Sequence, residues 1–400
     1  MTAPRLVVDL DKIHFNVSTL VSRLRPQGIS VTGVTKACMG DPRFAKTLLR
    51  AGVKTLGDSR IENIETMRAD GITAPMTLMR SPMPSQVDRV VRHADISFNT
   101  ELDVITALSN AAGQAGRRHG VVLMVELGDL REGIMPENLE EVARKALCLP
   151  NIEIKGLGTN LACRSGVSPD SRNMGELSRL ADVLENACGL VTSIVSGGNS
   201  SNLQWALSGA DTVRINDLRL GEAILLGLDP LERLPIAGLH TDAVSLVAEV
   251  IESKVKPSKP WGKIEQTAFG YALENVDLGT ISQSILAIGR QDIDPEGLTP
   301  PKGIRLLGAS SDHLMLDTSK HPVKVGSEIA FQPNYSALLR AMTSPFVTKE
   351  FMKADKAKSS PTDFFSRSHT GKNLRQWQYG LNCLGTADTS PLNRWDSITP

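Results

Sequence analysis

The chain has 400 residues, more than one hydrophobic core ordinarily supports, so a large domain and a smaller one are expected. Lys plus Arg and Asp plus Glu each total 44, and this zero formal net charge gives no electrostatic reason to expect a nucleic acid or a membrane surface as partner. No stretch approaches the roughly 20 apolar residues of a membrane span. The N-terminus lacks the pattern of a signal peptide, and five scattered cysteines argue against disulfides and structural zinc, so the cytoplasm is the predicted compartment.

An alternation of β-rich and helical segments runs from residue 29 to about 227. Helical periodicity is clear at 101–115, 137–148 and 171–188. Eight strands, each followed by a helix, fit the α/β class with a (β/α)8 TIM-type barrel, and an open doubly wound sheet is the competing interpretation. The eight predicted strands cover 30–36, 54–60, 76–80, 95–99, 121–127, 153–160, 192–199 and 212–217.

Beyond residue 240 short strands recur without long amphipathic helices between them, which predicts a C-terminal β domain over 241–352. The N-terminal entry, 1–28, contributes a strand at 5–10 that is expected to join this domain, and 29–240 forms the barrel. The polar segment 353–400 is expected to be a flexible tail, and a docked tail, indicated by Trp377, Tyr379 and Trp395, is the alternative. The predicted strands of the β domain cover 244–252, 284–289, 303–308, 313–317 and 327–331.

Lys36 stands at the end of the first predicted barrel strand, in VTGVTKACMG. In a barrel, chemistry is located at the C-terminal ends of the strands. A buried lysine is costly unless it is paired or covalently used, and desolvation makes its amine a nucleophile toward an aldehyde. The alternative is a lysine whose stem is buried while its amine reaches the rim. Other polar residues predicted at strand ends are Arg60, Arg80, Asn99, Asn160, Asn199 and Ser200.

Two glycine-containing turns fall where a barrel commonly binds phosphate, after its seventh and eighth strands. SGGNSSN (196–202) offers hydroxyl groups and flexible backbone, and LRLGEAILLG (218–227) leads through a Gly-Glu-Ala turn into an apolar helix. Free N–H groups at such a start bind phosphate well. Either segment alone would be an ordinary turn, but their positions together favour a phosphate site.

These segments resemble the alanine racemase family of pyridoxal-5′-phosphate (PLP) enzymes, and within it the ornithine racemase branch. The resemblance covers about residues 1–350 and implies a PLP-dependent racemase that interconverts the L and D forms of a free amino acid. It rests on eight motifs in order: DLDKIHFN (9–16), VTKA (34–37), LREGI (130–134), LRLGEAILLG (218–227), ILAIGRQDI (285–293), LLGASSDHLMLD (306–317), VGSEI (325–329) and NYSALLRAMTSPFV (334–347).

The resemblance implies that Lys36 carries PLP covalently and moves the substrate's α-proton on one face. Arg219 would contact the pyridine nitrogen, and because arginine does not readily donate a proton, the ring would stay a weaker electron sink. Arg131 would approach the phenolic side of the ring, and Asn160 stands where alanine-specific enzymes place a ring-stacking histidine. The residues expected at the phosphate end are Asn199, Ser200, Tyr335 and the backbone of Gly221 and Glu222.

Racemisation also needs a proton donor on the opposite face. Alanine-specific enzymes use a tyrosine in a Gly-Tyr-x-Asp strand from the second subunit, and this chain has Gly289-Arg290-Gln291-Asp292 there, which leaves that role unassigned. Met39 likewise stands near the position where those enzymes carry an active-site tyrosine. The candidates for the second acid–base group are Tyr271 and His313, with Cys163 as a weaker one.

The ornithine-type resemblance implies a substrate with a polar or cationic side chain, and a homodimer in which each β domain closes the other subunit's barrel. Arg290, Ser311 and Asp312 are the candidate substrate contacts. No metal site is expected. The alternatives are a PLP-dependent lyase or decarboxylase on the same scaffold, or a PLP-binding protein without turnover. Carboxylates that could bind a cationic side chain, each otherwise expected to be a surface charge or a cap, are Asp129, Glu132, Asp217 and Asp312.

Overall fold

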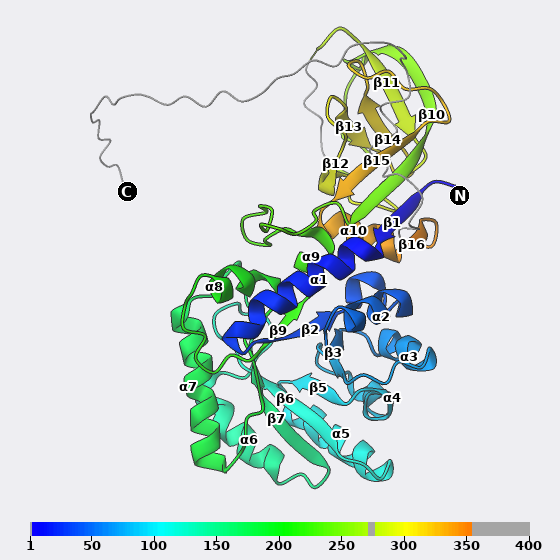
Figure 1. The fold of residues 1–400 in the computed structure, drawn as a ribbon. Coiled ribbons are helices and arrows are strands. Elements are labelled where there is room, and N and C mark those ends of the chain that lie inside the picture. The colour runs from blue at the N-terminus through cyan, green and yellow to red at the C-terminus, as the bar shows by residue number, and fades with distance from the viewer. Residues whose placement is uncertain (1, 271–276, 354–400) are drawn as a thin grey trace, which may run out of the picture. The chain divides into compact units, whose positions relative to one another are not determined.

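A closed barrel of eight parallel strands forms the larger part of the structure, a computed structural model that describes residues 2–270 and 277–353 (Figure 1). Each strand pairs with the next in chain order, and the first pairs with the last. The predicted TIM-type barrel is therefore confirmed, and the doubly wound sheet is excluded. Its strands are β2 (Ser30–Val34), β3 (Thr55–Asp58), β4 (Met76–Leu78), β5 (Ile96–Asn99), β6 (His119–Met124), β7 (Ile152–Gly158), β8 (Ile194–Ser196) and β9 (Asp217–Leu220).

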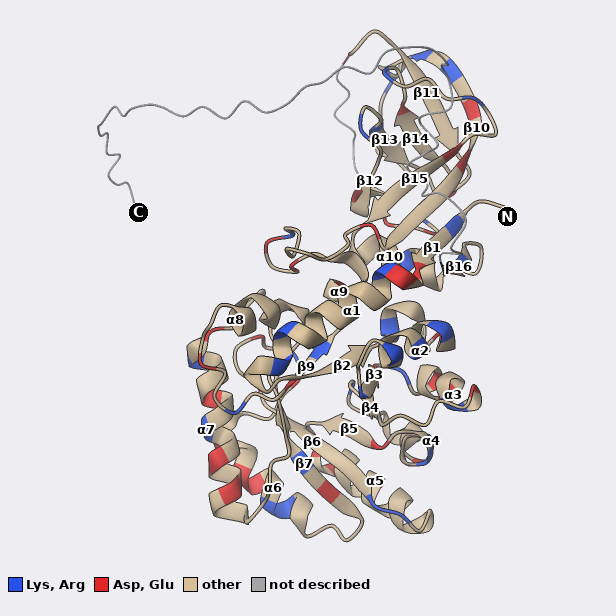
Figure 2. Cartoon of the chain, viewed as in Figure 1, with Lys and Arg blue, Asp and Glu red and all other residues tan. Residues whose placement is uncertain are grey.

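Helices lie outside the barrel strands, and local sequence signals set their ends. Asp170 caps the longest one, α7, in a capping box with Asn173, and Gly189 ends it in the left-handed conformation. Charges of both signs cover α6 and α7 (Figure 2). The α-helices around the barrel are α1 (Leu10–Leu24), α2 (Pro42–Arg50), α3 (Ile61–Ala69), α4 (Val87–His93), α5 (Leu102–Gln114), α6 (Leu139–Leu147), α7 (Ser171–Cys188), α8 (Leu203–Leu207) and α9 (Glu222–Leu226). Among the described helices, none is long and apolar enough to cross a membrane.

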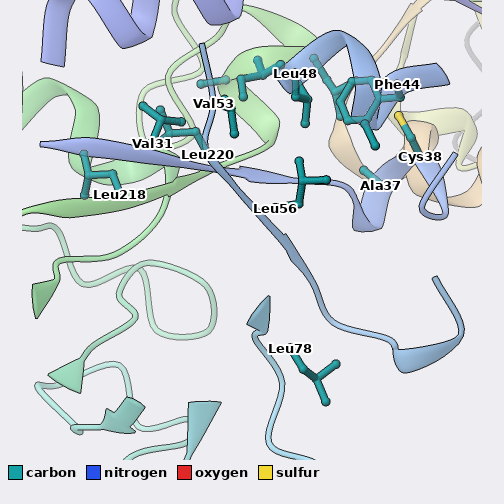
Figure 3. Packing of buried hydrophobic residues seen from close by; sticks show 14 of the residues in the cluster. Val31, Ala37, Cys38, Phe44, Leu48, Val53, Leu56, Leu78, Leu218 and Leu220 are labelled. Atoms are coloured by element: carbon teal, nitrogen blue, oxygen red, sulfur yellow. The ribbon is translucent and has the colours of Figure 1, made fainter. Parts of the chain in front are cut away.

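The barrel wall near β2 is packed closely against α2. Figure 3 shows Phe44 and Leu48 of this helix beside the turn that follows β2. A Cβ atom on Gly33 of β2 would lie 2.9 Å from Cδ1 of Leu48 and 3.1 Å from Cγ1 of Val53, so a larger residue there would require these side chains to shift. The apolar contact holds the carboxyl end of the first barrel strand in place.

The predicted boundaries of the first and last barrel strands were wrong, and these boundaries set the positions of Lys36 and Arg219. β2 ends at Val34, two residues before Lys36. The last strand is Asp217–Leu220, not 212–217, because the segment before it turns instead of extending. Val213 has φ +49°, and Arg214 forms ion pairs with Asp182 and Glu185 of α7. Arg219 therefore lies within the last barrel strand and not after it.

The remaining strands form an antiparallel sheet in the order β12-β15-β10-β11-β14-β13. β1 (Arg5–Asp9) pairs with β10 and, in parallel, with β16. The sequence had not indicated β12, β16 or the helix α10 (Tyr335–Thr343). The sheet strands are β10 (Val244–Pro257), β11 (Thr280–Leu286), β12 (Leu298–Thr299), β13 (Arg305–Ala309), β14 (Leu314–Asp317), β15 (Glu328–Pro333) and β16 (Thr348–Met352).

Replacement of Glu185 by glutamine is expected to lower the melting temperature near neutral pH and to have less effect in acid. Glu185 binds Arg214 at 2.7 Å and accepts hydrogen bonds from Thr192, which together hold its pKa down at about 2, against 4.5 ordinarily. Because the folded-state pKa is depressed, its stabilising effect is present above about pH 4.5 and is lost between pH 4.5 and about 2. Thermal unfolding at pH 7 and at pH 3 measures this, with Glu176→Gln on the same helix as control. Equal losses at both pH values would contradict the assignment.

Candidate active site

Lys36 opens a short 3-10 turn, Lys36–Cys38, at the C-terminal mouth of the barrel. Its side chain is exposed, whereas its neighbours Ala37 and Cys38 are buried and anchor the turn. The expectation of a lysine desolvated within an apolar strand was therefore wrong: the strand ends earlier and the amine reaches solvent. The turn presents this amine at the end of the barrel where the site is expected.

A buried carboxylate holds the turn that carries Lys36. Asp58, at the end of β3, accepts a hydrogen bond of 2.6 Å from the hydroxyl of Thr35. It also accepts bonds of 2.9 Å from the side chain of Asn63 and the backbone N–H of Arg60. Burial raises the pKa of Asp58, and these three donors oppose that rise. Asp58 thus ties the ends of the first two barrel strands together.

Ser200 and two backbone N–H groups converge after the last two barrel strands. The buried Oγ of Ser200 lies 3.4 Å from N of Gly221 and 3.2 Å from N of Ala223. Asn199, just before it, donates to the carbonyl of Leu161 at 2.9 Å and so fixes the loop. A hydroxyl and two N–H groups directed to one place suit a phosphate. The predicted pair of backbone groups was Gly221 and Glu222, and the structure directs Ala223 to the hydroxyl in place of Glu222.

The side chain of Glu222 lies near the candidate lysine. It forms an ion pair of 2.5 Å with Arg233. Burial raises the pKa of Glu222, and the positive charges of Arg233 and Lys36 oppose the rise. The charge of Lys36 therefore acts on Glu222, an interaction that the sequence had not indicated.

Arg219 lies inside the barrel, only 5% exposed. One end of its guanidinium donates to the hydroxyl of Ser196, and the other donates to the carbonyl of Thr159 at 2.7 Å. Its Cζ lies 5.2 Å from the centre of the Phe98 ring. Burial lowers the pKa of Arg219 to about 10. The guanidinium is thus held on three sides.

Asn160 lies between the groups expected to surround the cofactor's ring. Its side-chain oxygen accepts from Asn199 at 3.1 Å and from Arg219 at 3.4 Å. With the amide rotated, the oxygen accepts from Arg131 instead, at 3.0 and 3.3 Å. Arg131 is itself paired with Glu132 through two hydrogen bonds. The exposed Cys163 also belongs to this group, with its sulfur 3.5 Å from Nδ2 of Asn199.

Tyr335 begins α10 and brings a half-buried phenol to the same region. Burial raises the pKa of Tyr335, and the charges of Glu222, Cys163 and Cys38 raise it further. The phenol therefore stays protonated at neutral pH and is available as a hydrogen-bond donor. The structure thus brings together the predicted residues Lys36, Arg131, Asn160, Asn199, Ser200, Arg219, Gly221, Glu222 and Tyr335.

The other predicted site residues belong to the β domain. Ser311, Asp312 and His313 form the turn between β13 and β14, where Asp312 accepts from Ser311 at 2.9 Å and from His313 at 3.0 Å. Arg290 pairs with Glu296 and lies over the ring of Phe269. Within the described residues, no hydrogen bond or ion pair joins this turn to Lys36. Tyr271 lies outside the described residues.

Two of the four candidate carboxylates for a cationic substrate are not at the surface. Asp129 is fully buried and accepts from the backbone N–H groups of Arg164 and Ser165, so it organises a loop. Asp217 is also buried and accepts from the hydroxyls of Thr32 and Ser196. The alternative expectation for these two, a solvated surface charge or a helix cap, was wrong. Glu132 and Asp312 remain accessible.

A comparison with protein-family models places residues 8–229 in the family described as "Alanine racemase, N-terminal domain". Lysine racemase of Thermotoga maritima is 41% identical over 88% of this chain and 99% of its own length. Ornithine racemase of Acetoanaerobium sticklandii is 38% identical over 87% of this chain and 99% of its own length. The chain belongs to the alanine racemase family. The predictions of an amino-acid racemase and of PLP as cofactor are confirmed.

Solved structures share the fold at lower identity. Alanine racemase of Streptomyces lavendulae superposes with a TM-score of 0.68 at 18% identity, and covers 88% of this racemase and 98% of its own chain. D-threonine aldolase of Filomicrobium marinum gives a TM-score of 0.67 at 16% identity, covering 85% and 88%. The fold is therefore common to a racemase and an aldolase, and family membership, not the fold, identifies the reaction class.

The residues of this racemase fit PLP. A phosphate needs N–H and hydroxyl donors, which Ser200, Gly221 and Ala223 provide. An aldehyde needs an accessible amine, which Lys36 provides. The sequence did not indicate Phe98 or Thr159, which lie in no distinctive motif. Ser196 and Ala223 belong to the two turns that the sequence indicated, but their particular contacts were not predicted. The alternation Asp217-Leu218-Arg219-Leu220 in one buried strand could have indicated paired buried charges.

Replacement of Ser200 by alanine is expected to weaken PLP binding by about tenfold, because one hydrogen bond to a charged phosphate is lost. The measurement is the visible absorbance of protein-bound PLP on dilution of the holoenzyme. Ser178→Ala provides the control, because it removes another buried serine hydroxyl, on α7. Equal PLP affinity in the two variants would rule out the phosphate role.

Proposed function

We propose that this racemase acts on a free amino acid with a cationic side chain, ornithine or lysine. The observation that carries the proposal is that the chain spans 99% of the length of both a lysine racemase and an ornithine racemase, at 41% and 38% identity. In sequence, by contrast, alanine racemase of Treponema denticola is 23% identical over 67% of this chain. The cytoplasm remains our prediction for its compartment.

The residues at the barrel mouth suit the chemistry of racemisation. When bound, PLP supplies an aldehyde and an electron-accepting ring that stabilise negative charge on the substrate's α-carbon. Lys36 would hold the cofactor and remove or return the α-proton on one face. Arg219 would face the ring nitrogen, and since a guanidinium keeps its protons, it would not protonate that nitrogen. Ser200, Gly221, Ala223 and Tyr335 would bind the phosphate.

The proton on the second face requires another group, and we propose that it comes from a second copy of the chain. His313 lies in a turn of the β domain, with its Nδ1 3.0 Å from Asp312, which would orient the ring. Such a homodimer would place the β domain of one subunit over the barrel of its partner. Sedimentation measures the assembly, and His313→Asn should then slow racemisation without loss of PLP.

The test of the substrate class is a racemisation screen of ornithine, lysine, arginine, alanine and serine, read by chiral chromatography with and without added PLP. We expect ornithine or lysine to be converted fastest. Fastest turnover of alanine would overturn the proposed substrate class. Exchange of the α-proton in deuterated water without carbon–carbon cleavage would separate racemisation from a lyase reaction.

One of the two accessible carboxylates is expected to bind the substrate's side-chain ammonium. Glu132 lies beside Arg131 in the barrel loop, and Asp312 lies in the β-domain turn. Glu132→Gln or Asp312→Asn should raise KM for lysine about tenfold and leave KM for alanine unchanged, because alanine has no side-chain cation to pair with the carboxylate. Each variant is the control for the other, because only one of the two carboxylates is expected to bind the substrate. Unchanged KM values in both would remove these carboxylates from substrate recognition.

A further inference from the structure

The barrel interior holds a buried anion and a buried cation on one strand. Asp217 and Arg219 of β9 are 8% and 5% exposed, and at positions i and i+2 their side chains point to the same side of the strand. A buried carboxylate is costly unless it is hydrogen-bonded and compensated by a positive charge. Groups inside the barrel must therefore offset the free-energy cost of burying the Asp217 carboxylate.

Asp217 reaches Arg219 through a single hydroxyl group. One carboxylate oxygen accepts from the hydroxyl of Thr32 at 2.6 Å, and the other accepts from the hydroxyl of Ser196. The same Ser196 oxygen accepts a hydrogen bond from Nη1 of Arg219. The order of groups is therefore carboxylate, serine hydroxyl, guanidinium.

The chemistry of the carboxylate fixes the direction of these hydrogen bonds. An ionised carboxylate only accepts, so the one proton of Ser196 goes to Asp217 and the serine lone pairs remain for Arg219. Without the carboxylate, the hydroxyl could turn and leave the guanidinium without a fixed acceptor. Asp217 therefore sets the orientation of the Ser196 hydroxyl.

The groups around Asp217 also favour its ionised form, which is the form that the hydrogen-bond geometry requires. Burial raises the pKa of Asp217, but the hydroxyls of Ser196 and Thr32 and the charge of Arg219 oppose this rise. A cavity of about 300 Å³, lined in part by Thr32, Thr55 and Thr77, also borders Asp217 and is large enough for water. An ionised Asp217 in turn favours the charged form of Arg219.

We propose that Asp217 is a positioning residue, which acts through Ser196 to fix the orientation and charge of Arg219 for its contact with the ring nitrogen of PLP. The inference rests on the role proposed above for Arg219. Asp217 would then influence the environment of the cofactor's ring, and would not be only a buried charge that supports the fold.

The test compares the holoenzymes of the wild type, Asp217→Asn, Ser196→Ala, the double variant and Thr32→Val. Thr32→Val is the matched control, because it removes the other hydroxyl bound to Asp217 but leaves the Ser196–Arg219 bond. PLP affinity is read from visible absorbance on dilution, and the surroundings of the ring from the circular dichroism band of the bound cofactor. Thermal unfolding reports the stability of each variant.

We expect Asp217→Asn and Ser196→Ala each to weaken PLP binding about tenfold and to change the dichroism band, with no further loss in the double variant, because both act through one bond. Thr32→Val should stay within about twofold of the wild type in affinity while its melting temperature falls, and Ser196→Thr, which keeps a hydroxyl, should restore binding.

Three results would overturn the inference. Thr32→Val could lose as much PLP affinity as Asp217→Asn, or the losses of affinity in the two single variants could multiply in the double variant. The third is an Asp217→Asn variant whose cofactor dichroism band is the same as that of the wild type. If Asp217→Asn does not fold, the difference in PLP affinity between Ser196→Ala and Thr32→Val still tests the inference. Failure of the wild type itself to bind PLP would instead overturn the proposed function.

Discussion

Replacement of Lys36 by alanine is expected to abolish racemisation, with a loss of at least about a thousandfold in kcat/KM. The exposed amine of Lys36 is the group that would both hold PLP and move the α-proton, so two functions are lost together. Chiral chromatography with excess PLP measures the turnover. Borohydride reduction followed by peptide mass analysis measures the covalent link, and we expect modification at residue 36 in the wild type alone.

Lys36→Arg separates charge from nucleophilicity. It keeps a positive charge beside Glu222 but offers no amine for an aldehyde, so we expect it to be as inactive as the alanine variant. Turnover above one hundredth of the wild-type rate in either variant, or a reduced adduct at another lysine, would remove Lys36 from its proposed role.

Replacement of Arg219 by alanine is expected to lower the free energy of unfolding by about 3–5 kcal/mol and to remove most activity. The variant leaves Asp217 buried without its compensating charge and leaves the Thr159 carbonyl without its donor. Urea unfolding at pH 7 measures the stability. Since burial already raises the pKa of Asp217, the deficit should shrink in acid, where the carboxylate takes up a proton.

Two further variants separate stability from chemistry. Arg219→Lys keeps a charge near Asp217, so it should recover part of the stability but not the activity, because lysine lacks the planar fork. A double replacement of Asp217 and Arg219 by leucine removes both buried charges and should be more stable than Arg219→Ala. A double variant as unstable as Arg219→Ala would show that loss of packing, not an uncompensated charge, causes the deficit.

The architecture could be predicted from sequence because periodicity records burial locally. The span 171–188 coincides with α7, whose cap Asp170 and stop Gly189 are encoded in adjacent residues. The boundaries of β2 and β9 could not be predicted, because they depend on partners distant in the chain: Asp58 holds the turn after β2, and carboxylates of α7 hold Arg214 before β9. Propensity alone contains no record of such contacts.

The sequence by itself determined the barrel, the lysine that follows its first strand and the turns that suit a phosphate, since each is a local pattern of residues along the chain. Only the tertiary structure decided that Lys36 is exposed, that the N–H of Ala223 is directed to the hydroxyl of Ser200 and that Asp217 is buried and hydrogen-bonded to Ser196. The physical reason is that closure of the barrel joins β9 to β2 and β8, which sets side chains from positions 32, 196 and 217 in contact.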